Sequence, residues 1–156
     1  MSAVWLASPE EVEDVARLLV EFRNHLGHSW PPADSFITSV GQLIDGPDTE
    51  FLLAASDKDA LPAGICQLRF RHSVWTAAED CWLEDLFVLR EVRRRGLARA
   101  LVERALERAR EHGSRRVELD TNEDNHGAIR LYERLGFSPM SKGSSRSLFL
   151  GVRLGR

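Results

Sequence analysis

The sequence predicts an α/β fold in which helices cover a mixed sheet. Two observations lead to this expectation. Segments with strand-like and helix-like apolar patterns alternate along the chain, and its 156 residues suffice for one sizeable core. We therefore expect a single domain over residues 1–156, uninterrupted by repeats, linkers or low-complexity segments.

The first predicted strand, Ser2–Ala7, leads directly into a helix. Ser8, Pro9 and Glu11 supply a helix cap, a proline at the first helical position and the acid of a capping box. Gly27 is placed to end this helix. Its apolar face comprises Val12, Val15, Leu19, Phe22 and Leu26.

Prolines and turn residues divide the middle of the chain. Pro31 and Pro32 break it, and a shorter helix is expected over Asp34–Ile44. The strands expected next are Phe51–Ala55, Ala63–Arg71 and, after a variable-looking loop, Trp82–Leu89.

Helix and strand patterns continue to alternate in the second half. An amphipathic helix is expected over Gly96–His112, an apolar strand over Arg116–Thr121 and a last helix over Asn125–Leu135. Gly136 suits a left-handed cap after that helix, and Ser147–Leu154 can return as a final strand.

Charge is unevenly distributed, although the net charge is only −3. Ten of the 21 basic residues lie between Arg90 and Arg116. Those on the expected helix, such as Arg104 and Arg108, most simply keep its exposed face solvated. Nucleic-acid binding is disfavoured because the basic patch is short and lacks interleaved aromatic residues.

Cysteine use and hydropathy indicate the compartment. Cys66 and Cys81 are too few for a disulfide framework, and Cys66 lies in an apolar strand where a buried free thiol is ordinary. The first residues lack the basic and apolar regions of a signal peptide, and no run approaches the roughly 20 apolar residues of a membrane span. We expect a cytoplasmic protein that binds neither membrane nor metal.

The most informative segment is the turn between the strand ending at Leu89 and the helix that follows. Arg93, Gly96 and Ala98 have the spacing R-x-x-G-x-A, in which small residues let backbone amides point into a concavity at a helix N-terminus. Such a concavity binds phosphate. The turn is neither a Walker loop, because no Gly-Lys-Ser/Thr follows, nor a Rossmann fingerprint, because the second and third glycines are missing.

A second motif lies in the last predicted helix. In NHGAIRLYERLGF, Asn125 and Tyr132 stand seven residues apart. Together with the strand Leu83–Val88 and the turn after it, this segment resembles the acetyl-coenzyme A signature of the GCN5-related N-acetyltransferases (GNAT). Within that family the motifs are most similar to the diamine and polyamine acetyltransferase branch.

The resemblance implies a fold and a cofactor. The fold would be a twisted, mostly antiparallel mixed sheet of six to seven strands flanked by about four helices and splayed where acetyl-CoA inserts. The turn would hold the pyrophosphate of the cofactor, and the last helix would pack along its pantetheine arm. The cofactor-binding residues implied are Phe87, Val88, Arg93, Arg94, Arg95, Gly96, Leu97, Ala98, Arg99, Asn125 and Tyr132.

The sequence departs from the family pattern at the turn and before the strand. Arg94 stands where the family commonly has glycine, which predicts that this backbone position avoids a positive φ. Ala98 replaces the last glycine, within family tolerance. Trp75 has a counterpart in the branch and is a candidate substrate contact, but its spacing to Glu84 differs by one residue.

Acetyl transfer to an amine requires a base, because an alkylamine is mostly protonated at neutral pH and then has no lone pair. Glu84 stands where related enzymes place the glutamate that removes this proton. Asp85, a candidate substrate contact, points to the opposite side unless a bulge re-aims it. The resemblance implies such a distortion near Phe87 and Val88. Alternatively, both acids are solvated strand residues.

Two further groups complete the expected chemistry. A backbone amide of Phe87 or Val88 is expected to receive the charge that develops on the thioester oxygen. Tyr132, the only tyrosine, is expected to protonate the departing thiolate, and its alternative role is packing. Asn125 can cap the last helix as well as reach the cofactor.

Acidic residues near the expected base favour a small cationic amine as the acceptor, such as a polyamine, a diamino acid or an aminoglycoside. These residues are Glu79, Asp80, Glu84 and Asp85. A protein N-terminus or lysine is the alternative acceptor, and a non-catalytic acyl-CoA sensor is the alternative function. Because small members of the family are often dimers, a homodimer is expected.

Overall fold

The computed structural model describes residues 2–139 and 143–155. The chain forms two compact units, residues 1–120 and residues 121–156, which are taken in turn. Among the described residues, no helix combines the length and the apolar character needed to cross a membrane.

The first unit contains a mixed sheet of five strands, in the order β1-β2-β3-β4-β5. The strands β1 to β4 pair with one another in antiparallel fashion, and β5 runs parallel to β4, so the expected mixed, mostly antiparallel sheet is confirmed. The strands are β1 Ala3–Leu6, β2 Thr49–Ala55, β3 Gly64–Ser73, β4 Ala78–Val88 and β5 Val117–Glu118.

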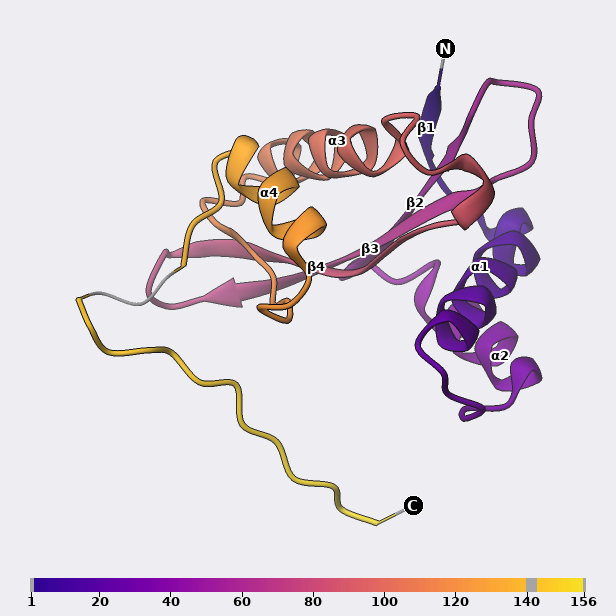
Figure 1. Ribbon diagram of the computed structural model, residues 1–156. Coiled ribbons are helices and arrows are strands. Elements are labelled where there is room, and N and C mark those ends of the chain that lie inside the picture. The colour runs from indigo at the N-terminus through magenta and orange to yellow at the C-terminus, as the bar shows by residue number, and fades with distance from the viewer. Residues whose placement is uncertain (1, 140–142, 156) are drawn as a thin grey trace. The chain divides into compact units, whose positions relative to one another are not determined.

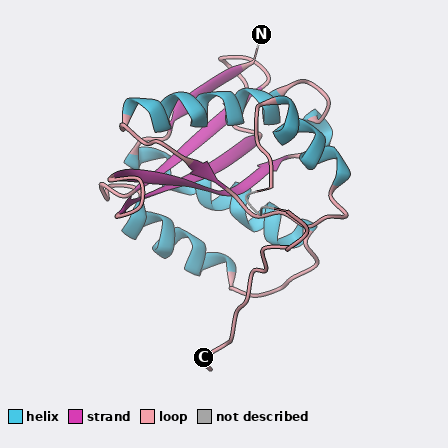
Figure 2. Ribbon diagram, turned by 90° about the vertical axis from the view of Figure 1, so that its left-hand side faces the viewer, coloured by secondary structure: helices cyan, strands magenta, loops and turns pink. Residues whose placement is uncertain are grey.

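Helices cover both faces of this sheet (Figures 1 and 2). Helix α3, Leu97–Glu111, lies along one face, and α1, Val12–His25, and α2, Ala33–Leu43, lie on the opposite face. Two short 3-10 turns, Pro9–Glu11 and Arg90–Val92, precede α1 and α3.

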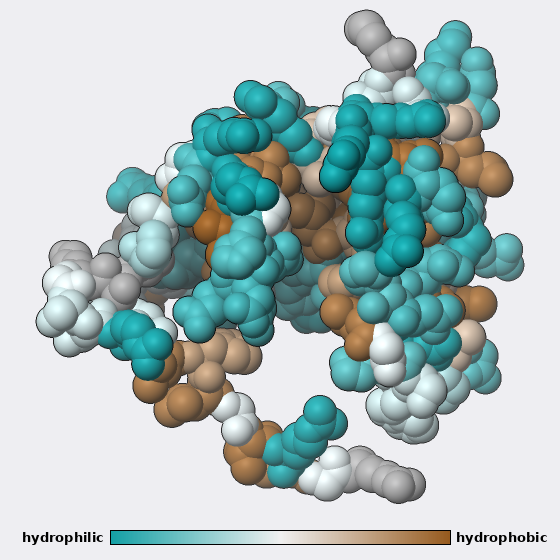
Figure 3. All heavy atoms as spheres, viewed as in Figure 1, coloured by the Kyte–Doolittle hydropathy of each residue, from teal (hydrophilic) through white to brown (hydrophobic). Residues whose placement is uncertain are grey.

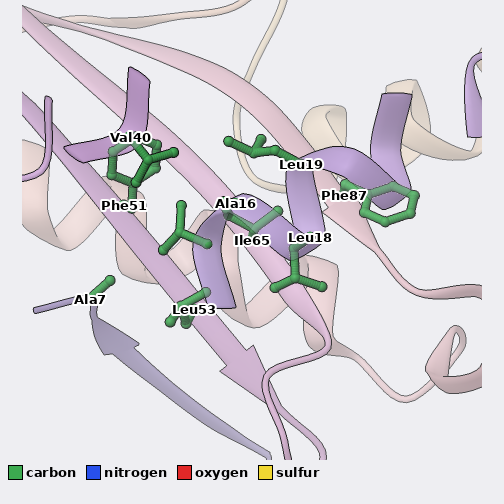
Figure 4. Packing of buried hydrophobic residues seen from close by; sticks show 10 residues of the cluster. Ala7, Ala16, Leu18, Leu19, Val40, Phe51, Leu53, Ile65 and Phe87 are labelled. Carbon is green, nitrogen blue, oxygen red and sulfur yellow. The ribbon is translucent and has the colours of Figure 1, made fainter. Parts of the chain in front are cut away.

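One apolar core lies between the sheet and the α1–α2 pair (Figure 4). It forms because the apolar residues of α1 recur every three or four positions and thus share one face. Their partners on the sheet alternate along each strand. The fully or nearly fully buried members include Val15, Leu18, Val40, Phe51, Leu53, Ile65 and Phe87.

The other face of the sheet packs against α3. Leu101, Val102 and Ala105 are completely buried there. Gly64 on β3 suits this packing, because a Cβ on it would lie 3.1 Å from Cδ1 of Leu101 and would push that side chain away by a few tenths of an ångström. The close approach fixes α3, and therefore the turn before it, against β3.

The predicted helix ends are present. Glu11 accepts a hydrogen bond from the Ser8 amide at 3.1 Å and a second one from the Trp5 indole at 2.9 Å, so the capping residue also ties β1 to the start of α1. Gly27 adopts a φ of +77° just after α1. This left-handed conformation ends the helix as expected.

Three predictions of strands need correction. The variable-looking loop before Trp82 is largely a hairpin, because β4 begins at Ala78 and pairs with β3 up to Ser73. The strand expected over Arg116–Thr121 is shorter in the structure, where only β5, Val117–Glu118, is present. Residues 147–154 are irregular in the structure, so the final strand is wrong, and the described sheet has five strands instead of six to seven.

The second unit contains helix α4, His126–Arg134. Gly136 has a φ of +97°, the left-handed cap that its position predicts. Beyond it, the described C-terminal segment carries exposed apolar side chains, visible as brown spheres at its end of the chain (Figure 3). They are Leu148, Phe149, Leu150, Val152 and Leu154.

Candidate functional site

The turn before α3 presents a run of backbone amides that the protein itself leaves free. Arg94 and Gly96 both have a positive φ, 65° and 80°, and the first helical bond of α3 runs from the Ala100 amide to the Gly96 carbonyl. Within the described residues, the amides from Arg94 to Arg99 have no acceptor. Adjacent amides in such a turn form a concavity for an anion. This geometry is the one that R-x-x-G-x-A predicts.

The positive φ at Arg94 contradicts the sequence-based expectation that this position avoids it. The left-handed region is costly for a residue with a Cβ but accessible to single residues in a tight turn. The turn therefore has the conformation that glycine favours even though arginine occupies it. The prediction was wrong because the turn geometry, and not the residue at this position, decides φ.

The arginines of the turn differ in their surroundings. The Nε of Arg93 donates to the Val88 carbonyl at 3.0 Å, and its guanidinium lies 5.8 Å from the centre of the Phe87 ring. Arg99 pairs with Glu103 at 2.7 Å. Arg94 and Arg95 are exposed and form no ion pair with the described residues. Thus Arg93 braces the turn against β4, and Arg94 and Arg95 remain available to a ligand.

Leu97 and Ala98 contribute backbone to the concavity instead of polar side chains. Leu97 is 1% exposed and packs into the core beneath the turn. Its apolar side chain therefore anchors the start of α3, and only its amide faces the concavity.

A bulge interrupts β4 just before this turn. Glu84 pairs with Gln67 and Phe87 with Ile65, so two residues, Asp85 and Leu86, oppose Cys66 alone. Asp85 takes a φ of 51°. The expected distortion exists, but it lies at Asp85–Leu86 and not at Phe87–Val88. Because of the extra residue, Glu84 and Phe87 face the same side of the sheet although they are three positions apart.

The edge of β4 that faces β5 is paired over only a short stretch. The two strands pair at Cys81–Val117 and at Trp82–Glu118, and within the first unit the ladder goes no further. From Leu83 to Val88 this edge of β4 is thus open toward the turn. Such an opening is the splay that the resemblance implies, and it exposes strand backbone groups to a ligand.

Glu84 carries its carboxylate on the bulged part of β4. Oε2 lies 3.3 Å from Nε of Arg69, and the Glu84 side chain is 30% exposed. Oε1 has no partner among the described residues, so one oxygen is held and the other can accept a proton. No sequence pattern pointed to Arg69, because the pairing depends on the register of β3 against β4.

Asp85 differs from its neighbour. Although the residue retains exposed surface, the protein atoms around its carboxyl desolvate it, and Glu84 and Asp120 add negative charge, so the pKa of Asp85 is raised. Arg69 opposes this shift. The fold therefore favours the protonated form of the Asp85 carboxyl group.

The other two acids expected near the acceptor are engaged elsewhere. Arg116 donates to Oδ2 of Asp80 at 2.6 Å, and Thr76 donates to its other oxygen at 2.8 Å. Burial alone would raise the pKa of Asp80, but these hydrogen bonds keep it below its usual value. Glu79 lies near His112, 4.0 Å away. The acidic surface is therefore smaller than the sequence suggests.

Trp75 lies at the exposed tip of the β3–β4 hairpin, where it is 91% exposed. The tip begins six residues along β4 from Glu84, which corresponds to about 20 Å of strand. The structure thus does not bring Trp75 and Glu84 together within the first unit.

In the second unit, Asn125 caps α4. Its Oδ1 accepts from the Ala128 amide at 3.4 Å. Tyr132 is 9% exposed, and its ring meets that of Phe137 edge to face with centroids 5.6 Å apart. The capping role of Asn125 and the packing of Tyr132 are therefore both present.

The profile described as the acetyltransferase (GNAT) family matches residues 12–137. This match covers most of the chain, and the protein belongs to that family, whose members use acetyl-CoA as the acetyl donor.

Individual relatives agree with this assignment. The thialysine N-epsilon-acetyltransferase of Caenorhabditis elegans is 33% identical over 81 residues, which cover 52% of this chain and 50% of that protein. N-alpha-acetyltransferase 30 of Schizosaccharomyces pombe is 30% identical over 89 residues, covering 56% and 57%. The chain spans 60%, 37% and 50% of the length of three curated relatives that it matches.

A solved structure described as a probable acetyltransferase superimposes with a TM-score of 0.84 at 25% identity, covering 97% of this chain and 99% of that one. The expected GNAT fold is therefore confirmed.

Proposed function

We propose that the protein transfers an acetyl group from acetyl-CoA directly to the primary amine of a small cationic acceptor. The free amides of residues 94–99, beside the open edge of β4, are the observation that carries this proposal. An anionic pyrophosphate fits such amides, and the amides of a pantetheine arm fit an unpaired strand edge. The family membership supports the same donor.

Acetyl-CoA supplies a thioester that is reactive toward amines. The amides of residues 94–99 and the side chains of Arg94 and Arg95 hold its phosphates. Arg93 acts indirectly, because its guanidinium is committed to Val88 and Phe87. The backbone of Phe87 and Val88 lies along the open edge and binds the arm of the cofactor. Asn125 and Tyr132 complete the set of cofactor-binding residues.

The transfer needs one base and one acid. The neutral amine attacks the thioester carbonyl, a C–N bond forms, the C–S bond breaks, and the amide of Phe87 or Val88 receives the negative charge on oxygen. Before this attack, Glu84 takes one proton from the ammonium form of the acceptor, directly or through one water, and releases it to solvent. Tyr132 gives a proton to the sulfur, and the second proton, which the nitrogen loses as the amide forms, returns to Tyr132 through solvent.

The acceptor need not be a small molecule. A peptide N-terminus is the second candidate, since N-alpha-acetyltransferase 30 is among the similar proteins. A non-catalytic sensor of acyl-CoA is a weaker alternative, because a sensor has no use for a partly exposed carboxylate with one free oxygen at Glu84. Trp75 remains a proposed substrate contact, reachable from Glu84 only by an extended acceptor.

We further propose that the protein acts as a cytoplasmic homodimer in which residues 1–156 form one domain. The free, buried thiols of Cys66 and Cys81 support a reducing compartment. Burial raises the pKa of Cys81 to about 12, so this thiol stays protonated and inert. The family match, residues 12–137, extends from the first compact unit into the second, which supports a single domain.

Release of free thiol from acetyl-CoA, measured across polyamines, amino acids, aminoglycosides and peptides, tests the proposed function. Glu84→Gln should lower turnover by about 10²–10⁴ with little change in CoA affinity, and higher pH should partly restore it. Glu107→Gln, an exposed change on α3, is the matched control. Near-normal turnover of Glu84→Gln at neutral pH would show that a group other than Glu84 is the base.

Tyr132→Phe tests the acid, because it keeps the ring and removes only the hydroxyl. Turnover should fall by about 10²-fold or more, and the loss should shrink with an acyl donor whose thiol is a better leaving group. A lower melting temperature with unchanged turnover per folded molecule would instead assign Tyr132 to packing against Phe137.

A further inference from the structure

One buried polar group on the sheet has no partner. Gln67 on β3 is 4% exposed, and its amide nitrogen Nε2 forms no hydrogen bond with the described residues. A buried donor without an acceptor destabilises the folded state, so such groups are rare and usually serve a purpose. The strand around it is otherwise apolar from Ala63 to Leu68.

The register places Gln67 between the core and the proposed base. It pairs with Phe51 of β2 on one side and with Glu84 of β4 on the other. Directly opposed side chains share a face of the sheet, with Cβ atoms about 4.5–5.5 Å apart. The side chains of Gln67 and of Glu84, the proposed base, therefore start from neighbouring positions on the same face of the sheet.

The same face carries cations beyond Gln67. Arg69 and Arg71 follow at two-residue intervals, and both are exposed. Arg69 already pairs with Glu84. A second ammonium group on the acceptor would meet these guanidinium groups and be repelled, whereas an oxygen that accepts hydrogen bonds would be attracted. The surroundings of Glu84 thus suit one amine accompanied by an oxygen.

We propose that the Nε2 amide of Gln67 donates a hydrogen bond to an oxygen on the carbon next to the amine-bearing carbon of the acceptor. Amino acid amides, peptide N-termini and vicinal amino alcohols have such an oxygen, and simple alkylamines and linear polyamines do not. The inference rests on the proposed function and narrows its acceptor. It makes Gln67 a residue that determines specificity.

Paired acceptors test this role. Glycinamide and isobutylamine have nearly the same shape, but only glycinamide carries the carbonyl oxygen. The measured quantity is the ratio of kcat/KM for glycinamide to that for isobutylamine. Comparing this ratio between the wild type and Gln67→Met cancels the difference in amine basicity, as in a double-mutant cycle.

In Gln67→Met the ratio should fall about tenfold, the equivalent of one hydrogen bond that a buried donor makes only with the oxygen-bearing acceptor. The melting temperature should stay the same or rise, since the buried unpaired donor is gone. Gln67→Glu keeps the side-chain shape but replaces the NH2 donor by an oxygen, so it should lower the ratio at least as far. This second variant takes the place of Gln67→Met if that variant does not fold. Gln42→Met, an exposed change on α2, should leave the ratio unchanged.

The possible results separate the two proposals. If both Gln67 variants lose kcat/KM equally for the two acceptors and have a lower melting temperature, Gln67 is a structural residue. This result would overturn the inference and leave the proposed function intact. A wild-type protein that acetylates none of the amines would overturn both.

Discussion

The two ends of α3 carry similar residues under opposite electrostatic conditions. At the C-terminal end, Arg108 donates to both carboxylate oxygens of Glu50, and His112 contacts Glu50 at 2.8 Å and stacks on Phe70. Cations at this end also complement the negative pole of the helix. The protein therefore satisfies its own charges here, and α3 is tied to β2.

At the N-terminal end, Arg94 and Arg95 have no acidic partner among the described residues, although Arg99 pairs with Glu103. The first turn of α3 contains no acidic residue, and Arg94 and Arg95 lie at the positive pole of the helix, where cations are unfavourable. An anion in the concavity would remove this cost. Arginines that cluster along one helix therefore have separate roles, which only their partners distinguish.

The largest expected effect comes from a valine at the left-handed position of the N-terminal end. Gly96→Val should weaken CoA binding by about a hundredfold, because it distorts several free amides, and should weaken pantetheine binding, which lacks the phosphates, much less. Calorimetric titration with both ligands measures this.

Gly113→Val provides the control. Gly113 has a φ of +78°, close to the +80° of Gly96, and a Cβ added to either glycine would meet no other atom within 4 Å. Both variants should lose a similar free energy of unfolding, about 1–2 kcal/mol. Equal loss of CoA affinity in the two variants would show that the ends of α3 do not differ as described.

The second effect concerns stability. Glu50→Gln removes the carboxylate that Arg108 and His112 share and leaves them only Glu111 and Glu79, which are more exposed than Glu50. Because the Arg108 and His112 side chains are only partly buried, we expect a loss of about 2 kcal/mol in the free energy of unfolding. CoA affinity should not change. Glu103→Gln, which removes the exposed partner of Arg99, should cost less than about 0.5 kcal/mol. Denaturant titrations of both variants decide whether the C-terminal end is the structural one.

A smaller effect is expected from the exposed arginines. Arg94→Gln combined with Arg95→Gln should weaken CoA binding by about fivefold, and the difference from wild type should fade as salt rises. Arg110→Gln at the other end of α3 should leave affinity unchanged. Binding of the double variant at wild-type strength in low salt would assign recognition to the backbone amides alone.

The smallest effect is a pH dependence. Burial alone would raise the pKa of Glu50, but hydrogen bonds from Arg108 and His112 lower it below the ordinary 4.5. A carboxyl group with a lowered pKa stabilises the folded state above the unfolded-state value, and this stability is lost as pH falls through the lowered pKa. The free energy of unfolding, measured from denaturant titrations between pH 6 and pH 3, should therefore fall more steeply with decreasing pH for the wild type than for Glu50→Gln.

Local sequence patterns were enough to predict the fold class, most helices and the turn with free backbone amides before α3. These features depend on local chemistry: apolar periodicity fixes α1 and α3, a capping box starts the first helix, and glycine permits the left-handed turn at Gly96. The family resemblance added Glu84, Asn125 and Tyr132, whose proposed roles remain to be tested.

Features that depend on register and burial emerged only from the folded chain. The bulge at Asp85, the pairing of Glu84 with Arg69 and the isolation of Gln67 arise where β3 meets β4, and no local pattern encodes which residues oppose each other there. The engagement of Asp80 by Arg116, 36 residues away, likewise removed an acid that the sequence had counted near the acceptor. Strand register is a long-range property, because a shift by one residue moves every side chain to the other face.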